Sequence, residues 1–167
     1  MPDHDADERA VLERMLDHQR AAIADLCAGL DEDQARARLV PSLTTPLGLV
    51  THATFVERVW FHSRVAGVPR EELGIPQQVE PSFVVEPDET IASVRATYVA
   101  ACEHSRAVAA EHELDETFPW HHGPVSLRFV YAHLIAELAR HAGHGDILRE
   151  QILAADRDPS GGGPEFA

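Results

Sequence analysis

The sequence predicts an all-α protein, a four-helix bundle with a long crossover between its second and third helices. Three features support this fold class. Apolar residues recur with the helical period in four segments, a proline-rich stretch separates the second segment from the third, and a polar stripe interrupts the apolar fourth segment. At 167 residues, 44% of them hydrophobic, the chain has the size of one globular domain. We expect a single domain over residues 1–155 and a disordered tail over residues 156–167.

The first helix is expected to begin after Asp7, whose side chain is of the N-capping type. Gly29 predicts a break, after which a short turn or helix runs through residues 35–39 until Pro41 ends it. The apolar positions of the first helix follow the helical period and should face the core: Leu12, Met15, Leu16, Ile23, Leu26 and Leu30.

The second long helix is predicted over residues 46–66. Thr44 and Thr45 are capping residues, and Pro46 suits the first helical position, where its missing amide hydrogen costs nothing. Three charged residues are assigned to the solvated face: Glu57, Arg58 and Arg64. The inward face combines apolar residues with one histidine: Leu49, His52, Phe55, Val56, Val59 and Trp60. His52 is therefore expected to be buried.

Residues 67–87 contain four prolines and little periodicity, which predicts the long crossover. Its SFVV segment either pairs as a strand or packs across the bundle. The third helix is expected to begin at Asp88 or Thr90 and to end near His112. Its predicted core positions are Ile91, Val94, Tyr98, Cys102 and Val108. The connection that follows contains Pro119, Gly123 and Pro124 and is predicted to be a loop.

The fourth helix is predicted over residues 126–153 and carries a polar stripe of His133, Glu137, His141 and His144. Its apolar residues should cover most of the circumference: Phe129, Val130, Leu134, Ile135, Leu138, Ile147, Leu148 and Ile152. Buried imidazoles and carboxylates must be paired, neutralised or coordinated. Because Glu137 and His141 project from one face a single turn apart, they suit a shared metal ion, although hydrogen-bonded core histidines are the alternative.

Charge and composition exclude several classes of function. A formal net charge of −14 disfavours partners rich in phosphate, so we expect neither a nucleic-acid nor a membrane partner. All 14 basic residues are arginine, which excludes Schiff-base lysine chemistry. Cys27 and Cys102 are isolated and are expected to be small core residues. The acidic N-terminus has no signal-peptide core and no run is long enough to span a membrane, so a cytoplasmic protein is expected.

Two stretches resemble the DinB/YfiT-like metal-binding bundle superfamily, and within it the mycothiol-dependent S-transferase branch. They are PLGLVTHATFVERVWF around His52 and SLRFVYAHLIAELARHAGHGDILREQI, and the likeness extends from the first helix to about Ile152. The resemblance implies a bundle with an atypical connection order that holds a divalent metal, usually zinc, by His52, Glu137 and His141. The chain departs from the branch at Ala53, commonly leucine, and at Ala136, commonly acidic. Neither change removes an implied ligand.

Two imidazoles and one carboxylate leave at least one coordination position open, as in catalytic zinc sites. The expected function is a metal-dependent transferase in which a low-molecular-weight thiol, mycothiol or a similar thiol, attacks an electrophilic small molecule as a zinc-bound thiolate. His133 and His144 are expected to support the ligands by hydrogen bonds or to replace Glu137. Arg140 and Arg149 are candidates for holding a carboxylate of either reactant, although surface ion pairs are favoured for each arginine alone.

Other functions remain open at this stage. The same site can activate water in a metal-dependent hydrolase, and the bundle can be a non-catalytic metal- or ligand-binding protein. A di-iron centre is excluded because the chain has no Glu-x-x-His, and zinc-protease chemistry because it has no His-Glu-x-x-His. Trp120, His121 and His122 are expected at the rim of the bundle. No catalytic side chain is identified, and a homodimer is left open.

Overall fold

The computed structural model describes residues 7–157 and shows an all-α fold, as predicted. Its long helices are α1 (Glu8–Ala24), α3 (Pro46–Glu57), α4 (Ile91–Ala110) and α5 (Leu127–Arg157). The short elements are α2 (Glu32–Ala35), the π-helical η1 (Arg58–Val65), the 3-10 helix η2 (Glu80–Phe83) and the strands β1 (Thr117–Phe118) and β2 (Val125–Ser126). Within the described chain, no helix is long and apolar enough to cross a membrane.

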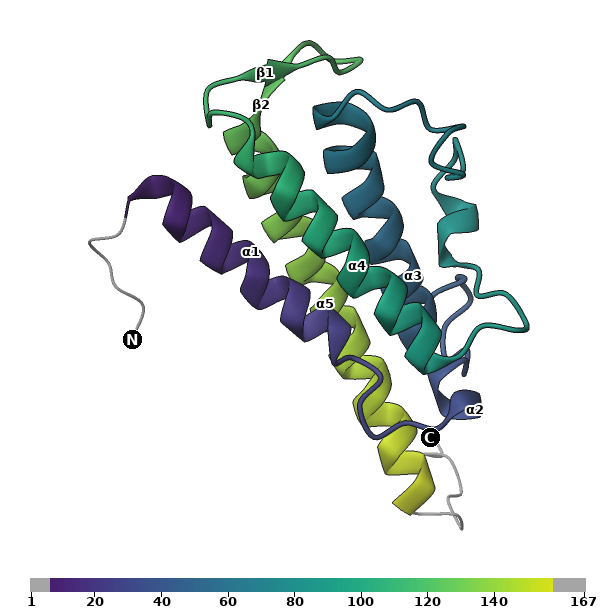
Figure 1. The fold of residues 1–167 in the computed structure, drawn as a ribbon. Coiled ribbons are helices and arrows are strands. Elements are labelled where there is room, and N and C mark those ends of the chain that lie inside the picture. Colours follow the sequence, from purple (N-terminus) through teal and green to yellow (C-terminus); the bar gives the residue numbers. More distant parts are fainter. Residues whose placement is uncertain (1–6, 158–167) are drawn as a thin grey trace.

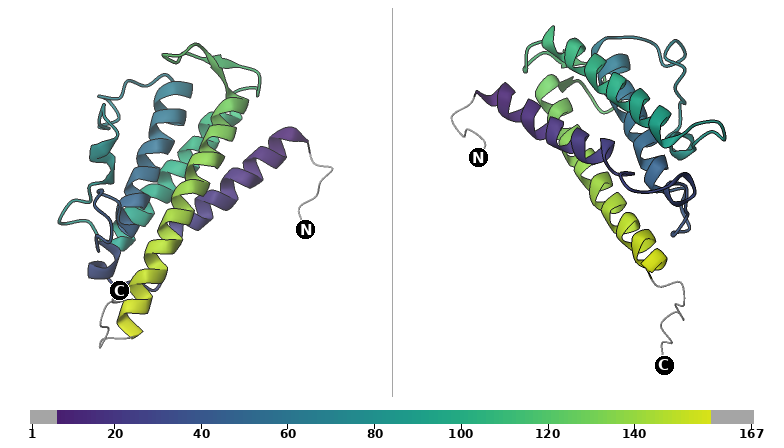
Figure 2. Two further views of the ribbon diagram at one scale, coloured as in Figure 1. Left: turned by 180° about the vertical axis from the view of Figure 1, so that it is seen from behind. Right: turned by 60° about the horizontal axis from the view of Figure 1, so that its bottom comes forward.

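The four long helices form a bundle in which α5 is the longest member (Figure 1). Helix α1 packs along α5, while α3 packs against both α4 and α5. The crossover between η1 and α4 runs along the outer side of α3, where η2 contacts that helix. Figure 2 shows that α5 extends past the rest of the bundle at its C-terminal end. The predicted bundle and its long crossover are therefore confirmed.

Three of the long helices begin where the sequence signals place them. The Asp7 side chain accepts a hydrogen bond from the Arg9 amide at the start of α1. The Thr45 hydroxyl accepts one from Gly48 at the start of α3, and Thr90 forms a capping box with Ser93 at the start of α4. These side chains satisfy amides that have no partner in the first turn of a helix, which fixes the helix starts locally.

Several predicted boundaries were wrong. The short helix α2 spans Glu32–Ala35, because Asp31 and Gln34 form a capping box there. It therefore ends at the residue where the predicted turn or helix over residues 35–39 begins. The predicted loop before α5 contains the hairpin of β1 and β2, and the SFVV segment contributes to the 3-10 helix η2 rather than to a strand. Helix α5 includes residues 156–157, and the rest of the expected tail lies outside the described residues.

Three residues assigned to the core are exposed at the surface instead. Phe129 is 39% exposed, Met15 49% and Ile147 57%. The apolar cover of α5 is thus narrower than predicted, because only part of its circumference meets α1 and α3. The predicted core cysteines are buried, and burial raises the pKa of Cys27 to about 11 and that of Cys102 to about 12. Both thiols are therefore protonated at neutral pH.

The prediction that Glu57 faces solvent was also wrong. Its side chain is fully buried, and the guanidinium of Arg20 on α1 donates two hydrogen bonds of 2.8 Å to its carboxylate. Burial alone lowers the pKa of Arg20, but the adjacent Glu57 carboxylate outweighs burial and raises it above its ordinary value. Since the partner lies 37 residues away in the chain, the pair was not visible in the local pattern.

His62 on η1 is buried as well. Its Nε2 lies 3.1 Å from the Ala101 carbonyl and 3.2 Å from the Ser105 hydroxyl on α4. The helix changes from α to π hydrogen bonding at Arg58, and the wider turn of an i→i+5 ladder shifts the residues that follow toward a different face. Arg64 is partly buried for the same reason and lies over the ring of Trp60.

Candidate metal centre

His52 on α3 meets Glu137 and His141 on α5. The Oε1 atom of Glu137 lies 3.1 Å from His141 Nε2 and 3.6 Å from His52 Nε2. All three donor groups offer an atom within 4.8 Å of the others. Ligands about 2.1 Å from a tetrahedral metal are about 3.4 Å apart, so the two measured separations bracket the value that zinc requires. The structure thus brings together the three residues implied by the sequence resemblance.

Ser82 on η2 fixes the orientation of the His52 ring. Its Oγ lies 2.8 Å from His52 Nδ1 and donates its own hydrogen to the Val79 carbonyl at 2.5 Å. Because the serine hydrogen is already used, Ser82 Oγ accepts from Nδ1–H. The neutral ring therefore keeps its proton on Nδ1, and the lone pair on Nε2 points toward Glu137. This is the arrangement that metal-ligating histidines adopt.

Gly48 allows the crossover to come this close to α3. A Cβ atom at this position would lie 2.7 Å from the Phe83 carbonyl and 2.9 Å from Thr45 Oγ1, which is too short for a real contact. Phe83 also stacks on the His52 ring, with ring centroids 4.0 Å apart. The glycine in the PLGLVTH segment is therefore needed for η2 to reach His52.

The protonation states of the cluster suit a cation. Burial lowers the pKa of His52, and the imidazoles of His141 and His52 hold the pKa of Glu137 well below its usual range. A neutral imidazole and an ionised carboxylate are the forms that bind metal. Among the described residues, His52 Nε2 has no hydrogen-bond partner although it is buried. Two imidazoles and one carboxylate form a donor set typical of catalytic zinc, so the residues fit that metal.

A cavity of about 210 Å³ adjoins the cluster and is lined by both His52 and Glu137. Its other walls are mostly apolar and aromatic, with Phe55, Val56, Val59 and Trp60 from α3 and η1. Arg70 and Gln77 line it from the crossover, and His133 from α5. A small organic molecule in this cavity would touch the donor atoms on one side and apolar side chains on the other.

The four neighbouring residues singled out in the sequence occupy different positions. His133 lines the cavity and packs on Trp60, with ring centroids 4.4 Å apart. His144 is exposed, and its ring centroid lies 5.7 Å from that of His141. Arg140 is largely exposed and lies 3.5 Å from Glu137 Oε2. Arg149 donates a hydrogen bond to the Ala28 carbonyl beyond the end of α1 and does not line the cavity.

The aromatic residues of the hairpin lie close to this cavity. Trp120 packs against Trp60, with ring centroids 5.7 Å apart, and also against Phe129. His121 and His122 are exposed beside Trp120. Their expected place at the rim agrees with these contacts.

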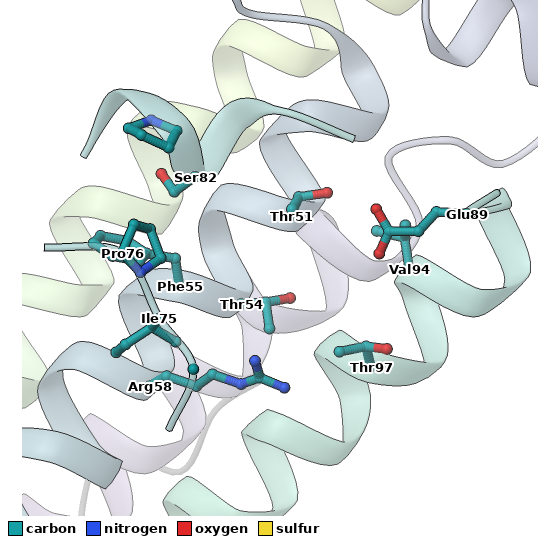
Figure 3. A pocket seen from close by; sticks show the side chains of 12 residues that line it. Thr51, Thr54, Phe55, Arg58, Ile75, Pro76, Ser82, Glu89, Val94 and Thr97 are labelled. Carbon is teal, nitrogen blue, oxygen red and sulfur yellow. The ribbon is translucent and has the colours of Figure 1, made fainter. Parts of the chain in front are cut away.

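A second hollow of about 170 Å³ lies between α3, the crossover and α4 (Figure 3). Thr51, Thr54 and Arg58 line it from the α3 side, and Thr97 lines it from α4. Ser82 lines this hollow while its hydroxyl contacts His52, so the serine separates the hollow from the candidate metal centre.

Sequence reasoning missed Ser82 and Arg70 as residues of the site. Both belong to the crossover, which has no periodicity from which a facing side can be deduced. The one available signal was Gly48, because a glycine inside an apolar helical segment indicates close approach of another backbone.

Fold and site together define a helical bundle with a candidate divalent-metal centre at the side of an apolar cavity. The family model for mycothiol-S-transferase matches residues 11–154, which is most of the chain. The protein therefore belongs to the mycothiol-S-transferase family. A search among curated proteins found no match.

Proposed function

We propose that this protein is a metal-dependent S-transferase that uses a low-molecular-weight thiol, mycothiol or a similar thiol, to modify an electrophilic small molecule. His52, Glu137 and His141 would hold the metal, and zinc is the ion that this donor set favours. Membership of the mycothiol-S-transferase family supports the thiol and the transfer reaction. The cavity lined by His52 and Glu137 would receive the substrates.

One observation carries the metal assignment. The lone pair of His52 Nε2 points at the Glu137 carboxylate from 3.6 Å, and Ser82 occupies the only other ring nitrogen. Two hydrogen-bond acceptors that face each other in a buried place repel unless a cation lies between them. A core histidine held only by hydrogen bonds would present a proton to the carboxylate instead.

The residues of the chain would bind and orient the reactants. Ser82 holds the His52 ring, and Val56, Val59 and Trp60 keep water from much of the cavity. When bound, the divalent metal lowers the pKa of a coordinated thiol from its ordinary value of about 8.5 and so supplies a thiolate. In the reaction with monochlorobimane, sulfur forms a bond to carbon, chloride leaves with the electron pair of the C–Cl bond, and the thiol proton passes to solvent.

Metal content and conjugation activity test the proposal. We expect one zinc per chain by elemental analysis of the purified protein and none in His52→Ala. The zinc-loaded protein should conjugate monochlorobimane only when mycothiol is present. His18→Ala is a matched control, because His18 is exposed on α1 and does not line the cavity.

The rival functions give different results in the same assay. Product formation that does not depend on thiol would contradict the transferase and favour a hydrolase that activates water. Stoichiometric zinc without either activity would favour a non-catalytic metal-binding bundle. The cytoplasmic location and the homodimer considered above stay predictions.

A further inference from the structure

Two arginines beside the cavity lack the acidic partners that their surroundings would lead one to expect. The chain has 28 acidic and 14 basic residues. Nevertheless, neither Arg64 nor Arg70 forms an ion pair with a carboxylate in the described part of the chain. Glu137 is the one acidic residue in the cavity wall, and two imidazoles flank it.

Arg70 lies in the cavity wall and is held in place by the crossover. Its Nη1 donates hydrogen bonds to the carbonyls of Gln77, at 2.9 Å, and Pro76, at 3.4 Å, and its guanidinium lies over the ring of Phe55. A guanidinium has five N–H donors in a rigid plane, so donors of Arg70 remain for another acceptor. Both Gln77 and Phe55 also line the cavity.

Arg64 lies over the Trp60 ring, which forms part of the same wall. Its guanidinium carbon is 4.1 Å from the centroid of Trp60 and 5.7 Å from that of Trp120. Its Nη1 is buried and has no hydrogen-bond partner within residues 7–157. Burial and, secondly, the charge of Arg70 lower the pKa of Arg64. A buried cationic donor without a partner is stabilised when an anion binds beside it.

We propose that this cavity binds a small organic acid, with its carboxylate held by Arg70, its apolar body against Trp60 and Phe55, and the charge of Arg64 at the Trp60 ring adding to the attraction. Guanidinium groups favour carboxylates because their paired donors match the two oxygens. A volume of about 210 Å³ suits a molecule of the size of a substituted benzoate. As an assignment of substrate class, the inference rests on the proposed function: one of the two reactants carries the carboxylate. The binding site itself does not depend on catalysis.

Tryptophan fluorescence tests the binding site directly. The chain has only two tryptophans, Trp60 and Trp120, and both lie against Arg64. Benzoate should change their emission with saturation, whereas neutral benzamide should not. Arg70→Gln should weaken benzoate binding at least tenfold, and Arg64→Gln should weaken it to a smaller extent. The matched control Arg95→Gln removes one charge at the surface, where Arg95 pairs with Asp25, and should bind as the wild type does.

Two further comparisons complete the binding experiment. His52→Ala should retain benzoate binding, because Arg70 rather than the metal holds the carboxylate. Equal responses to benzoate and benzamide, or unchanged binding in Arg70→Gln, would overturn the proposal. So would the loss of binding in His52→Ala with a native circular-dichroism spectrum, since the carboxylate would then have been bound to the metal.

Comparing an acid with its methyl ester then shows which of the two reactants carries the carboxylate. The electrophile pair is 4-chloro-3-nitrobenzoate and its methyl ester, with mycothiol as the thiol. The thiol pair is 3-mercaptopropionate and its methyl ester, with monochlorobimane as the electrophile. In one pair the acid should exceed the ester at least tenfold in kcat/KM, and Arg70→Gln should bring this ratio close to one.

The two proposals fail in different ways. If neither these pairs nor mycothiol with monochlorobimane are conjugated, the proposed transferase is wrong, while saturable benzoate binding would still establish the anion site. If both pairs are conjugated with equal kcat/KM for acid and ester, the transferase stands and the carboxylate assignment is overturned.

Discussion

Two carboxylates, Glu57 at the end of α3 and Glu137 on α5, have surroundings that differ in a way that separates structure from function. Glu57 is fully buried and receives two hydrogen bonds from Arg20, so its charge is balanced within the protein. Glu137 is partly exposed to a cavity and faces two imidazoles, one of which directs a lone pair at it. The first pair is complete without a ligand. Under the proposed function, a cation would complete the second cluster.

The comparison shows that burial of charge is a poor guide to function unless hydrogen-bond partners are counted as well. Arg20 and Glu57 satisfy each other in a fork-shaped contact and do not line the cavity of the candidate site. At the candidate metal centre, buried nitrogens of His52 and His141 lack hydrogen-bond partners in the region that the structure describes. Unpartnered polar atoms beside a cavity are the feature that distinguishes the candidate site.

The largest effect on stability is expected when Glu57, the carboxylate that Arg20 balances, loses its charge. Glu57→Gln leaves the buried Arg20 without its counter-charge and should lower the free energy of unfolding by about 3–5 kcal/mol. Urea denaturation of the metal-free protein measures this loss. Glu103→Gln, at an exposed position on α4, should stay within about 0.5 kcal/mol of the wild type. Equal stability of the two variants would contradict the structural role of the pair.

For Glu137 we expect little change in stability and a large loss of zinc binding. Glu137→Gln should leave the urea stability of the metal-free protein within about 1 kcal/mol, because this side chain borders a cavity. It should weaken zinc binding at least a hundredfold and abolish the rise in Tm that zinc causes in the wild type. A competitive chelator assay and thermal denaturation with and without zinc measure the two effects. Zinc affinity equal to that of the wild type would remove Glu137 from the metal centre.

Ser82 gives a finer test, because it affects the site without being a ligand. Ser82→Ala removes the acceptor that orients His52 and should weaken zinc binding by roughly 10- to 100-fold with all three ligands still present. The affinity is measured with the same chelator. Ser63→Ala, on η1, should have wild-type affinity. If Ser82→Ala binds zinc as tightly as the wild type, the hydrogen bond does not set the orientation of the ring.

The smallest effect is expected at His62, a buried histidine that belongs neither to the Arg20–Glu57 pair nor to the candidate metal centre. Burial lowers the pKa of His62, and His104, Glu57 and Arg58 are the ionisable groups around it. Since the unfolded chain takes up this proton near pH 6.5 and the folded chain resists it, stability falls as pH drops below 6.5. The loss from this group is at most about 1.4 kcal/mol per pH unit. His62→Asn should flatten that slope.

Proton NMR gives a direct check on the same histidine. The His62 ring signal in the folded protein should titrate with a midpoint below 6.5. A midpoint at or above that value would contradict the depressed pKa, and the observed acid destabilisation would then have another source.

The local parts of the fold could be predicted because local physics determines them. Capping side chains, the helical period and prolines lie within a few residues of the features that they specify, as at Thr45 and Pro46. The α-helical spacing likewise puts Glu137 and His141 on one face of α5. The resemblance to a family added His52, which periodicity alone could only identify as buried.

The sequence by itself determined four helices, a long crossover and the ligand pair on α5, since each follows from contacts between near neighbours in the chain. Tertiary structure decided that Arg20 balances Glu57, that Ser82 orients His52 and that Arg70 lines the cavity. These contacts join segments about 20 to 70 residues apart along the chain, and no local period records them. The change to π hydrogen bonding at Arg58 has a related cause, because packing overrode the regular helical turn. As a result, His62 and Arg64 point to a different side of the helix from the one that the α-helical period predicts.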